Sequence, residues 1–324
     1  MNEEEPQHPA KRSVKKERKL NRSLIKSVIV IIVGAFNALV SALTGIGAHI
    51  TYAPMLTWML GFSSEKAQGS ALNYSVYASG IAFLVTGYFQ KNGFYLAGRG
   101  ALIFIGATFG AMALAKFTPK PDDFNRKRLM QTMGLFIAIF VGREAGHIDP
   151  LNEGQIHFAL LHEWWQIALV GAAAGALTQA MGLVSGVILF PALLMLTGIV
   201  VQGTLRGLNA YEAVGICLFV VFLASLLPAW SYRQKKLVDL DYVNFSFIGA
   251  LLGGVGGGIL LTNLQPRIIV VFFAIVCILL SGRELYRLFW HALPIEETGV
   301  EPQNRSKVDS IAESITKNEH DDTK

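Results

Sequence analysis

The sequence predicts an all-α, polytopic membrane protein made of two inverted repeats of about five helical segments each. Hydrophobic residues make up 52% of the 324 residues and charged residues only 16%, a balance well to the apolar side of soluble domains. Apolar runs near the roughly 17–25 residues of a membrane-spanning helix recur between residues 24 and 290. A motif of glycine and proline also occurs once in each half. Together these features predict about 8–10 transmembrane segments, with one broken segment per half.

The first half begins with a basic leader, residues 1–23, which is rich in lysine and arginine and poor in apolar residues. This composition predicts a disordered, cytoplasmic extension. The first membrane repeat is expected over residues 24–145. Its apolar segments are expected at about residues 24–43, 44–60, 69–89, 97–116 and 128–142. The second of these is short and contains glycine and proline, so it either spans the bilayer or returns from its interior.

The second half follows a polar linker, residues 146–163, which is expected outside the cytoplasm. The second membrane repeat is expected over residues 164–291. Its apolar segments are expected at about residues 164–181, 183–198, 207–230, 243–262 and 267–282. Residues 292–324 form a polar tail with too few apolar residues for a core, which predicts a second disordered extension.

Matches between the halves follow the same order along the chain. Residues 44–56 (TGIGAHITYAPML) correspond to residues 181–193 (MGLVSGVILFPAL), and one spacing separates both the glycine pair and the proline pair. Three shorter matches follow in the same order. Ala-Leu-Asn at 71–73 corresponds to Gly-Leu-Asn at 207–209, Ile-Gly-Ala at 105–107 to Ile-Gly-Ala at 248–250, and Gly-Arg-Glu at 142–144 to Gly-Arg-Glu at 282–284. Collinear recurrence of this kind indicates a duplication.

The distribution of positive charge predicts the orientation of the chain. With five segments per half and a cytoplasmic N-terminus, the basic leader, the 117–127 loop and the 231–242 loop all lie inside the cell. Counting only one segment in residues 24–60 would place the basic loop near residue 120 outside, against the positive-inside rule. An odd number of crossings per half makes the second half enter from the opposite side, as in inverted-repeat transporters of the cell membrane.

With the repeated Gly-rich segment that ends in Pro-x-Leu after the first helix of each half, the chain resembles the TauE/SafE family of sulfite and organosulfonate exporters. The resemblance covers about residues 24–290 and is carried by residues 45–56, 182–193, 106–110 and 249–258. Where the family usually has a denser glycine cluster before the proline, this chain has Ala48-His49 and Val184-Ser185. The resemblance implies export of a small sulfur-containing anion.

Glycine and proline inside the bilayer expose backbone N–H and C=O groups that only protein or water can satisfy, so the two breaks are expected to form an anion cradle. Polar side chains within spans are costly and add candidates. Close helix packing through small residues is the alternative role of the glycines, and it is favoured for residues 253–258. The candidate pathway residues are Gly45, Gly47, His49, Pro54, Asn73, Gln179, Gly182, Ser185, Gly186, Pro191, Arg206, Asn209 and Glu212.

Three of these candidates recur at every third residue, which predicts one helix face carrying Arg206, Asn209 and Glu212. Arg206 could hold an anion with two hydrogen bonds, and Glu212 or His49 could exchange a proton that couples transport to the proton gradient. The alternatives are an interfacial Arg206 and a Glu212 engaged in a structural ion pair.

These features predict a secondary transporter that exports sulfite or an organosulfonate, with proton coupling left open. The alternatives are a non-transporting membrane assembly or receptor protein and a membrane-embedded enzyme. The expected partners are a small anionic solute and the lipid bilayer, with no nucleic acid, cofactor or metal, and the sequence leaves open whether the chain forms a homodimer.

Overall fold

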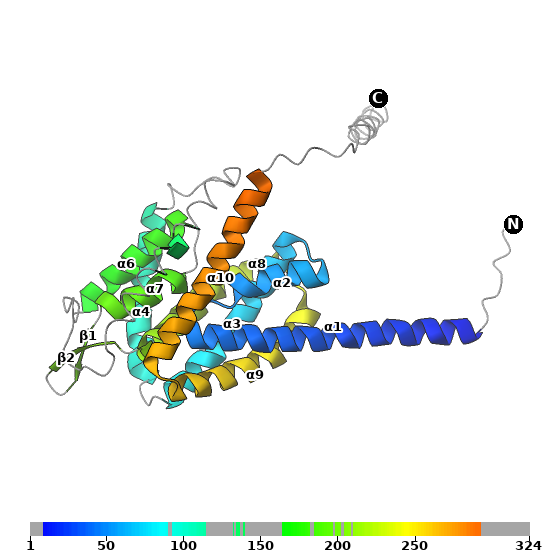
Figure 1. Ribbon diagram of the computed structural model, residues 1–324, viewed down its shortest axis with the longest axis horizontal. Coiled ribbons are helices and arrows are strands. Elements are labelled where there is room, and N and C mark those ends of the chain that lie inside the picture. The colour runs from blue at the N-terminus through cyan, green and yellow to red at the C-terminus, as the bar shows by residue number, and fades with distance from the viewer. Residues whose placement is uncertain are drawn as a thin grey trace, which may run out of the picture. The chain divides into compact units, whose positions relative to one another are not determined.

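The computed structural model (Figure 1) describes residues 9–89, 93–114, 164–181, 185–196, 198–201, 204–208 and 210–292, with isolated positions between 132 and 139. The chain divides into two units, Met1–Glu284 and Leu285–Lys324, and the candidate site lies in the first. The predicted fifth segment of the first half, residues 128–142, lies mostly outside the described residues. The predicted linker and the tail after residue 292 lie outside them entirely.

The described chain is helical, which confirms the predicted fold class. The first half contributes α1 (Pro9–Thr44), α2 (His49–Leu60), α3 (Ser64–Phe89) and α4 (Gly93–Leu114). The second half contributes α6 (Trp164–Met181), α7 (Ser185–Leu196), α8 (Ala210–Gln234), α9 (Leu240–Asn263) and α10 (Pro266–Ala292). Each helix coincides with an apolar segment expected from the sequence.

The structure departs from the expectation in two places. Helix α1 begins at Pro9 instead of near residue 24, so it extends into the predicted leader. A short antiparallel hairpin, β1 (Gly198–Val201) with β2 (Thr204–Gly207), lies between α7 and α8. Its β-branched residues favour extended backbone. The third segment of the second half therefore begins as a helix only at Ala210.

The two halves pack against each other reciprocally. The first helix of the first half, α1, lies along α9, the fourth helix of the second half (Figure 1). The first helix of the second half, α6, lies along α4, the fourth helix of the first half. The two third helices, α3 and α8, contact each other. This exchange of equivalent contacts is what a two-fold relation between repeats produces, whereas superposition about an axis in the membrane plane stays a prediction.

Glycine lets these helix pairs approach closely. A Cβ placed on Gly106 or Gly110 of α4 would overlap the backbone of α6, at the carbonyls of Ala168 and Ala172. In the equivalent pair, a Cβ on Gly253 of α9 would overlap the carbonyl of Ala35 in α1, and Gly249 and Gly257 are similarly close to α1. The glycine cluster of α9 is thus helix contact, as the sequence favoured.

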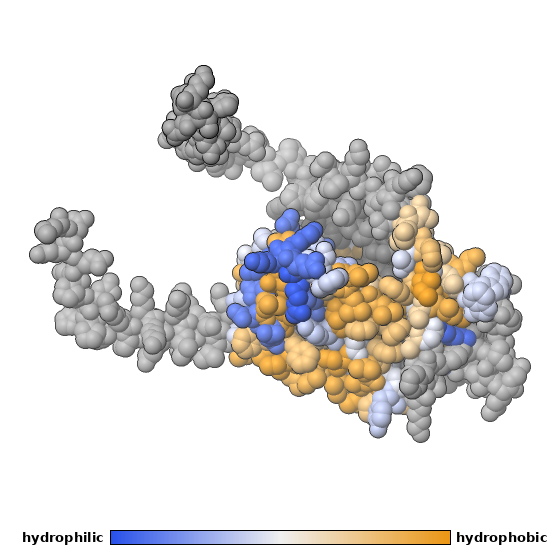
Figure 2. All heavy atoms as spheres, turned by 180° about the vertical axis from the view of Figure 1, so that it is seen from behind, coloured by the Kyte–Doolittle hydropathy of each residue, from blue (hydrophilic) through white to orange (hydrophobic). Residues whose placement is uncertain are grey.

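The outer surface suits a lipid environment. In the described part of the chain, three helical stretches are long and apolar enough to cross a membrane, which are Ser27–Thr44, Ala210–Gln234 and Leu240–Asn263. Large apolar side chains such as Phe36 and Phe109 are exposed, and the face drawn in Figure 2 is broadly apolar, with most of its polar residues gathered in one patch. Helix α3 is less apolar because it contacts α1, α2, α8 and α9, which shield it from lipid.

Candidate functional site

The centre of the candidate site is the glycine loop, residues 45–48, which connects α1 to α2. Gly45 ends α1 in the left-handed conformation, with φ of +68°, and donates its N–H to the carbonyl of Ser41 at 2.8 Å. Glycine is favoured at such a helix end because a Cβ is strained at positive φ. Here a Cβ would also lie 2.7 Å from the Cβ of Cys217 in α8. Glycine is therefore favoured at position 45 for two reasons, the left-handed backbone conformation and the lack of room for a side chain.

The glycine loop carries the chain back into the bundle before α2 begins. Gly45 lies beside Cys217, and Gly47 lies beside Val221, one turn further along α8. The Nδ1 atom of His49, the first residue of α2, lies 3.2 Å from Oγ of Ser75, near the middle of α3. Helix α2 therefore starts level with the middle of α3. This geometry supports a half-helix within the bundle over one that spans the full depth.

The N-terminus of α2 is suited to an anion. Its cap residue is Ala48, which makes no side-chain capping hydrogen bond. The first N–H groups of a helix point along its axis and carry partial positive charge, which a serine, threonine or aspartate cap normally satisfies. Here the N–H of Ile50 donates to the carbonyl of Gly47 at 3.2 Å. An oxyanion in the loop would accept hydrogen bonds from the other N–H groups at the start of α2.

The two Gly-Pro segments meet at the glycine loop. Gly186, the second residue of α7, packs so closely against the glycine loop that a Cβ would overlap the carbonyl oxygen of Gly45 and lie 3.1 Å from Cα of Ile46. Pro54 and Pro191 lie within α2 and α7, and Pro191 is buried. The starts of both short helices are thus close together, as expected for discontinuous helices around one site.

Polar contacts fix α2 against the first half and α9. The hydroxyl of Tyr52 is hydrogen-bonded to Oγ of Ser246 in α9, and the Tyr52 ring stacks on Tyr74 with centroids 4.1 Å apart. Tyr74 in turn donates to the carbonyl of Gly34 in α1. Asn37 of α1 donates to Sδ of Met55 at 3.2 Å. These contacts hold α2 from three sides, and sequence reasoning did not identify them.

Asn73 has a structural partner. Its Nδ2 donates to the carbonyl of Gly69 at 3.0 Å and to that of Ala229 in α8 at 3.2 Å. This amide ties α3 to α8, on a face different from the one that carries Ser75. A direct role for Asn73 in anion binding stays a prediction.

The expected helix face of Arg206, Asn209 and Glu212 is wrong. Arg206 lies in β2, where it pairs with Ile199, and α8 begins four residues later. A spacing of three residues shares a helix face only if the whole stretch is helical. Glu212 lies in the first turn of α8 and is buried, where the helix dipole favours a carboxylate.

Several other candidate residues of the second half lie, wholly or by their side chains, outside the described part of the chain. Asn209 and Gly182 are outside the described residues, and the side chains of Gln179, Ser185 and Arg206 are too. Among the described residues, no three histidine, cysteine or acidic side chains are grouped so that they could hold a metal ion.

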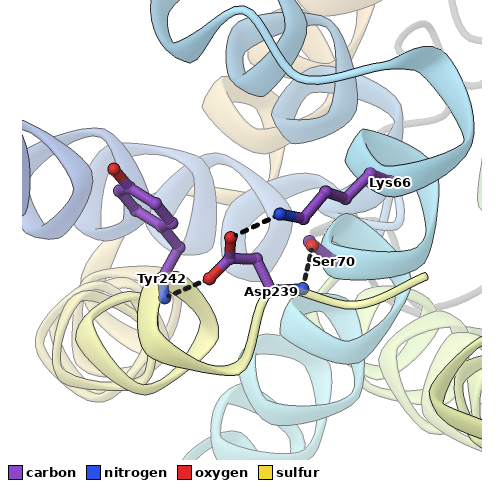
Figure 3. Close-up of polar contacts among 4 residues, drawn as sticks. All are labelled: Lys66, Ser70, Asp239 and Tyr242. Carbon is purple, nitrogen blue, oxygen red and sulfur yellow. Dashed lines mark hydrogen bonds and ion pairs between the residues drawn. The ribbon is translucent and has the colours of Figure 1, made fainter. Parts of the chain in front are cut away.

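A second polar cluster joins the two halves at one end of the bundle (Figure 3). Nζ of Lys66 in α3 lies 2.7 Å from Oδ2 of Asp239, while the other carboxylate oxygen caps α9 by accepting from the backbone N of Tyr242. The backbone N of Asp239 donates to Oγ of Ser70 at 3.1 Å. The cluster puts the α2–α3 and α8–α9 connections at the same end, in agreement with the predicted topology. The aspartate just before α9 was a sequence signal for the cap, but nothing in the sequence pointed to the lysine.

Comparisons with known proteins place this geometry in context. A family model described as "Sulfite exporter TauE/SafE" matches residues 7–141 and 162–314, on either side of the predicted linker. No curated protein and no solved structure matches the chain significantly.

Proposed function

Because the chain belongs to the TauE/SafE family of membrane transporters for sulfite or related anions, we propose that it exports sulfite or an organosulfonate across the cell membrane. It is an integral membrane protein. The observation that supports an anion site most directly is the N-terminus of α2, which has no side-chain cap and begins inside the bundle at the glycine loop.

The site suits a small oxyanion because its attraction comes from backbone dipoles. The N–H groups at the start of α2 offer directional hydrogen bonds and a partial charge of roughly half a proton. A fixed lysine or arginine would hold the anion more strongly, whereas transport requires that the anion also leave. Contact between Gly186 and Gly45 brings the second half to the same place, so relative movement of the halves would alter the site.

His49 is the proposed proton carrier. Its imidazole is the titratable side chain at the start of α2, and Nδ1 is within hydrogen-bond distance of Ser75. A neutral histidine at this position would leave the helix N-terminus free to attract an anion, while proton binding would add a positive charge beside it. Anion and proton would therefore bind cooperatively and move together.

The proposed orientation has the N-terminus and the basic loops in the cytoplasm. Cysteines introduced at positions 122 and 152 test it with a membrane-impermeant thiol reagent on intact cells. Position 152 should react and position 122 should not. Labelling at 122 with none at 152 would reverse the topology.

Flux in proteoliposomes tests the transport activity. Purified protein is reconstituted, and counterflow of labelled sulfite is measured against unlabelled sulfite, sulfoacetate, sulfate and acetate, with and without a pH gradient. We expect sulfite or sulfoacetate to support counterflow, at a rate that the pH gradient changes. Counterflow by none of these anions would contradict the proposal.

A pair of substitutions at Ala48 tests the location of the site. Asp and Asn are both good helix caps of nearly the same size, so Ala48→Asp and Ala48→Asn share any steric cost at this buried position. Only Ala48→Asp places a fixed negative charge where the anion would bind. We expect flux at least about tenfold lower in Ala48→Asp than in Ala48→Asn, from charge repulsion of at least about 1.4 kcal/mol. Equal flux would exclude the α2 N-terminus.

A substitution at His49 tests the coupling. His49→Asn retains a polar group near the position of Nδ1 but cannot bind a proton at neutral pH. We expect this variant to perform anion counterflow that no longer responds to a pH gradient. Unchanged pH dependence would assign coupling to another group, with Ser75→Ala as the control that removes only the hydrogen bond.

A further inference from the structure

Four buried hydroxyl oxygens make no hydrogen bond among the residues that the structure describes. They belong to Ser41 in α1, Ser79 and Thr86 in α3, and Ser281 in α10. A hydroxyl removed from water without a partner costs free energy, so each such group needs an explanation. Serine and threonine in helices usually satisfy the hydroxyl on a carbonyl one turn back, as Thr44 and Thr108 do here.

Two of these hydroxyls share a helix face with the residue that holds His49. At 100° per residue, Ser79 and Thr86 fall within about 40° of Ser75 around α3. Neighbouring faces of α3 are occupied, since Gly80 packs on Phe222 of α8 and Ala78 borders Gly254 of α9. The line of Ser75, Ser79 and Thr86 lies between these faces and contains the contact with His49. Thr86, however, lies about 16 Å beyond Ser75 along α3, and a Cβ on Gly258 of α9 would lie 3.5 Å from its Oγ1, so only Ser79 is near the glycine loop.

Ser79 is level with the glycine loop. Gly47 contacts Val221 of α8, and Gly80, the neighbour of Ser79, contacts the next residue, Phe222. Gly47 and Gly80 therefore lie at the same depth along α8. The Ser79 hydroxyl faces the side of α3 from which α2 approaches.

Ser41 approaches the same region from α1. Its carbonyl accepts the N–H of Gly45, so it lies one turn before the glycine loop. Around α1, its side chain falls between the directions of Gly34, which contacts Tyr74 of α3, and Asn37, which contacts Met55 of α2. Hydroxyls from two helices of the first half thus converge around the loop, whereas Ser281 lies on α10.

We propose that Ser79 and Ser41 donate hydrogen bonds to the transported oxyanion and form its neutral binding shell beside the glycine loop. This inference rests on the proposed function and adds the residues that recognise the substrate. The oxygens of a sulfite or sulfonate group accept several hydrogen bonds at once, and neutral donors bind an anion without holding it as tightly as a cation would. The hydroxyls are closed off from solvent here, so the anion reaches them when the helices around the loop separate.

Matched substitutions separate a binding role from a structural one. Equilibrium binding of labelled sulfite and the thermal midpoint of unfolding are measured on purified wild type, Ser79→Ala, Thr86→Val and Ser281→Ala. Removing a hydroxyl that has no protein partner should leave the midpoint unchanged or raise it. Losing a hydrogen bond to an anion should raise the Kd for sulfite about tenfold or more in Ser79→Ala. Thr86→Val removes a hydroxyl about 10 Å further along the same helix and should bind like the wild type. Ser281→Ala should bind like the wild type.

Each result decides one point. Wild-type affinity in Ser79→Ala overturns the binding shell while leaving the proposed function intact. An equal loss of affinity in Ser281→Ala also overturns it, because that hydroxyl is remote in sequence and lies on another helix. If the wild type neither binds nor carries sulfite, sulfoacetate, sulfate or acetate, the proposed function itself fails.

Discussion

Helices α2 and α7 occupy equivalent places in the two repeats, yet they use different chemistry. Tyr52 and Leu189 correspond in the repeat, and both are buried, as are the corresponding Leu56 and Leu193. Tyr52, however, carries a hydroxyl bonded to Ser246, while the described side chains of α7 are apolar and pack with residues such as Phe273. The duplication retained the packing positions, and the polar groups are concentrated in the first repeat.

The difference is sharpest where each short helix begins. By the spacing of the repeat, His49 corresponds to Gly186. His49 reaches Ser75 with its ring, whereas Gly186 lets α7 approach the backbone of the glycine loop. The first half contributes the titratable side chain, and the second half contributes a glycine that allows the two segments to pack closely. An inverted repeat can thus form one asymmetric site from two similar segments.

The largest effect is expected from replacing Gly186 with a larger residue. Gly186→Leu would drive a side chain into the carbonyl of Gly45, so we expect loss of most folded protein as well as transport. Gly256→Leu is the control, because nothing lies within 4 Å of a Cβ there. Monodispersity in size-exclusion chromatography and flux are measured. A folded, active Gly186→Leu would show that α7 does not need this contact.

A smaller effect is expected from the apolar core of α7. Leu189→Ala removes a fully buried side chain, which costs about 2–5 kcal/mol in well-packed cores. Unfolding in a mixed-micelle titration measures the change in free energy. A loss below about 1 kcal/mol would mean that α7 is loosely packed and would weaken the contrast with α2.

The matching change in α2 is expected to cost less. Tyr52→Phe retains the ring stacked on Tyr74 and removes only the hydroxyl, while Ser246 still donates to the carbonyl of Tyr242 at 2.6 Å. We expect a loss of about 0.5–1.5 kcal/mol in the free energy of unfolding, measured in the same titration. Ser246→Ala in the Tyr52→Phe background should add little more, since the pair is then already broken.

The smallest effect is expected at the ion pair beyond the end of α2. Asp239→Asn retains an N-cap for α9 and loses the charge opposite Lys66, which is partly exposed, so we expect a change of about 0–1 kcal/mol. Asp239→Ala also loses the cap, and its cost should exceed that of Asp239→Asn by about 0.5–2 kcal/mol. Equal costs would show that the cap contributes nothing.

Much of the fold could be predicted from the sequence because the length, hydropathy and caps of each helix are visible in its own residues. The segment of residues 243–262 is mostly apolar and follows a capping aspartate, and α9 begins at Leu240. The hairpin was missed because its residues lie almost entirely between two expected apolar segments, 183–198 and 207–230, and Arg206 was assigned to a helix from its spacing to Asn209 and Glu212 alone. A face derived from spacing is only as good as the assigned secondary structure.

The candidate site was predictable in part. Gly45, Gly47, Gly186 and His49 were identified because glycine and an intramembrane histidine are unusual inside apolar segments. The hydroxyls of Ser41 and Ser79 gave no such signal, because serine and threonine are common in helices and normally bond to their own backbone. Only the absence of a partner in the described structure distinguishes them.

The sequence by itself determined the apolar helices, the duplication and the position of a break in each half, because helix length, hydropathy and glycine act locally along the chain. The tertiary structure decided which segments meet. It places Gly186 against Gly45, His49 against Ser75 and Lys66 against Asp239. These contacts join residues far apart in the chain, and they depend on the packing of helices whose depth and rotation no local pattern encodes.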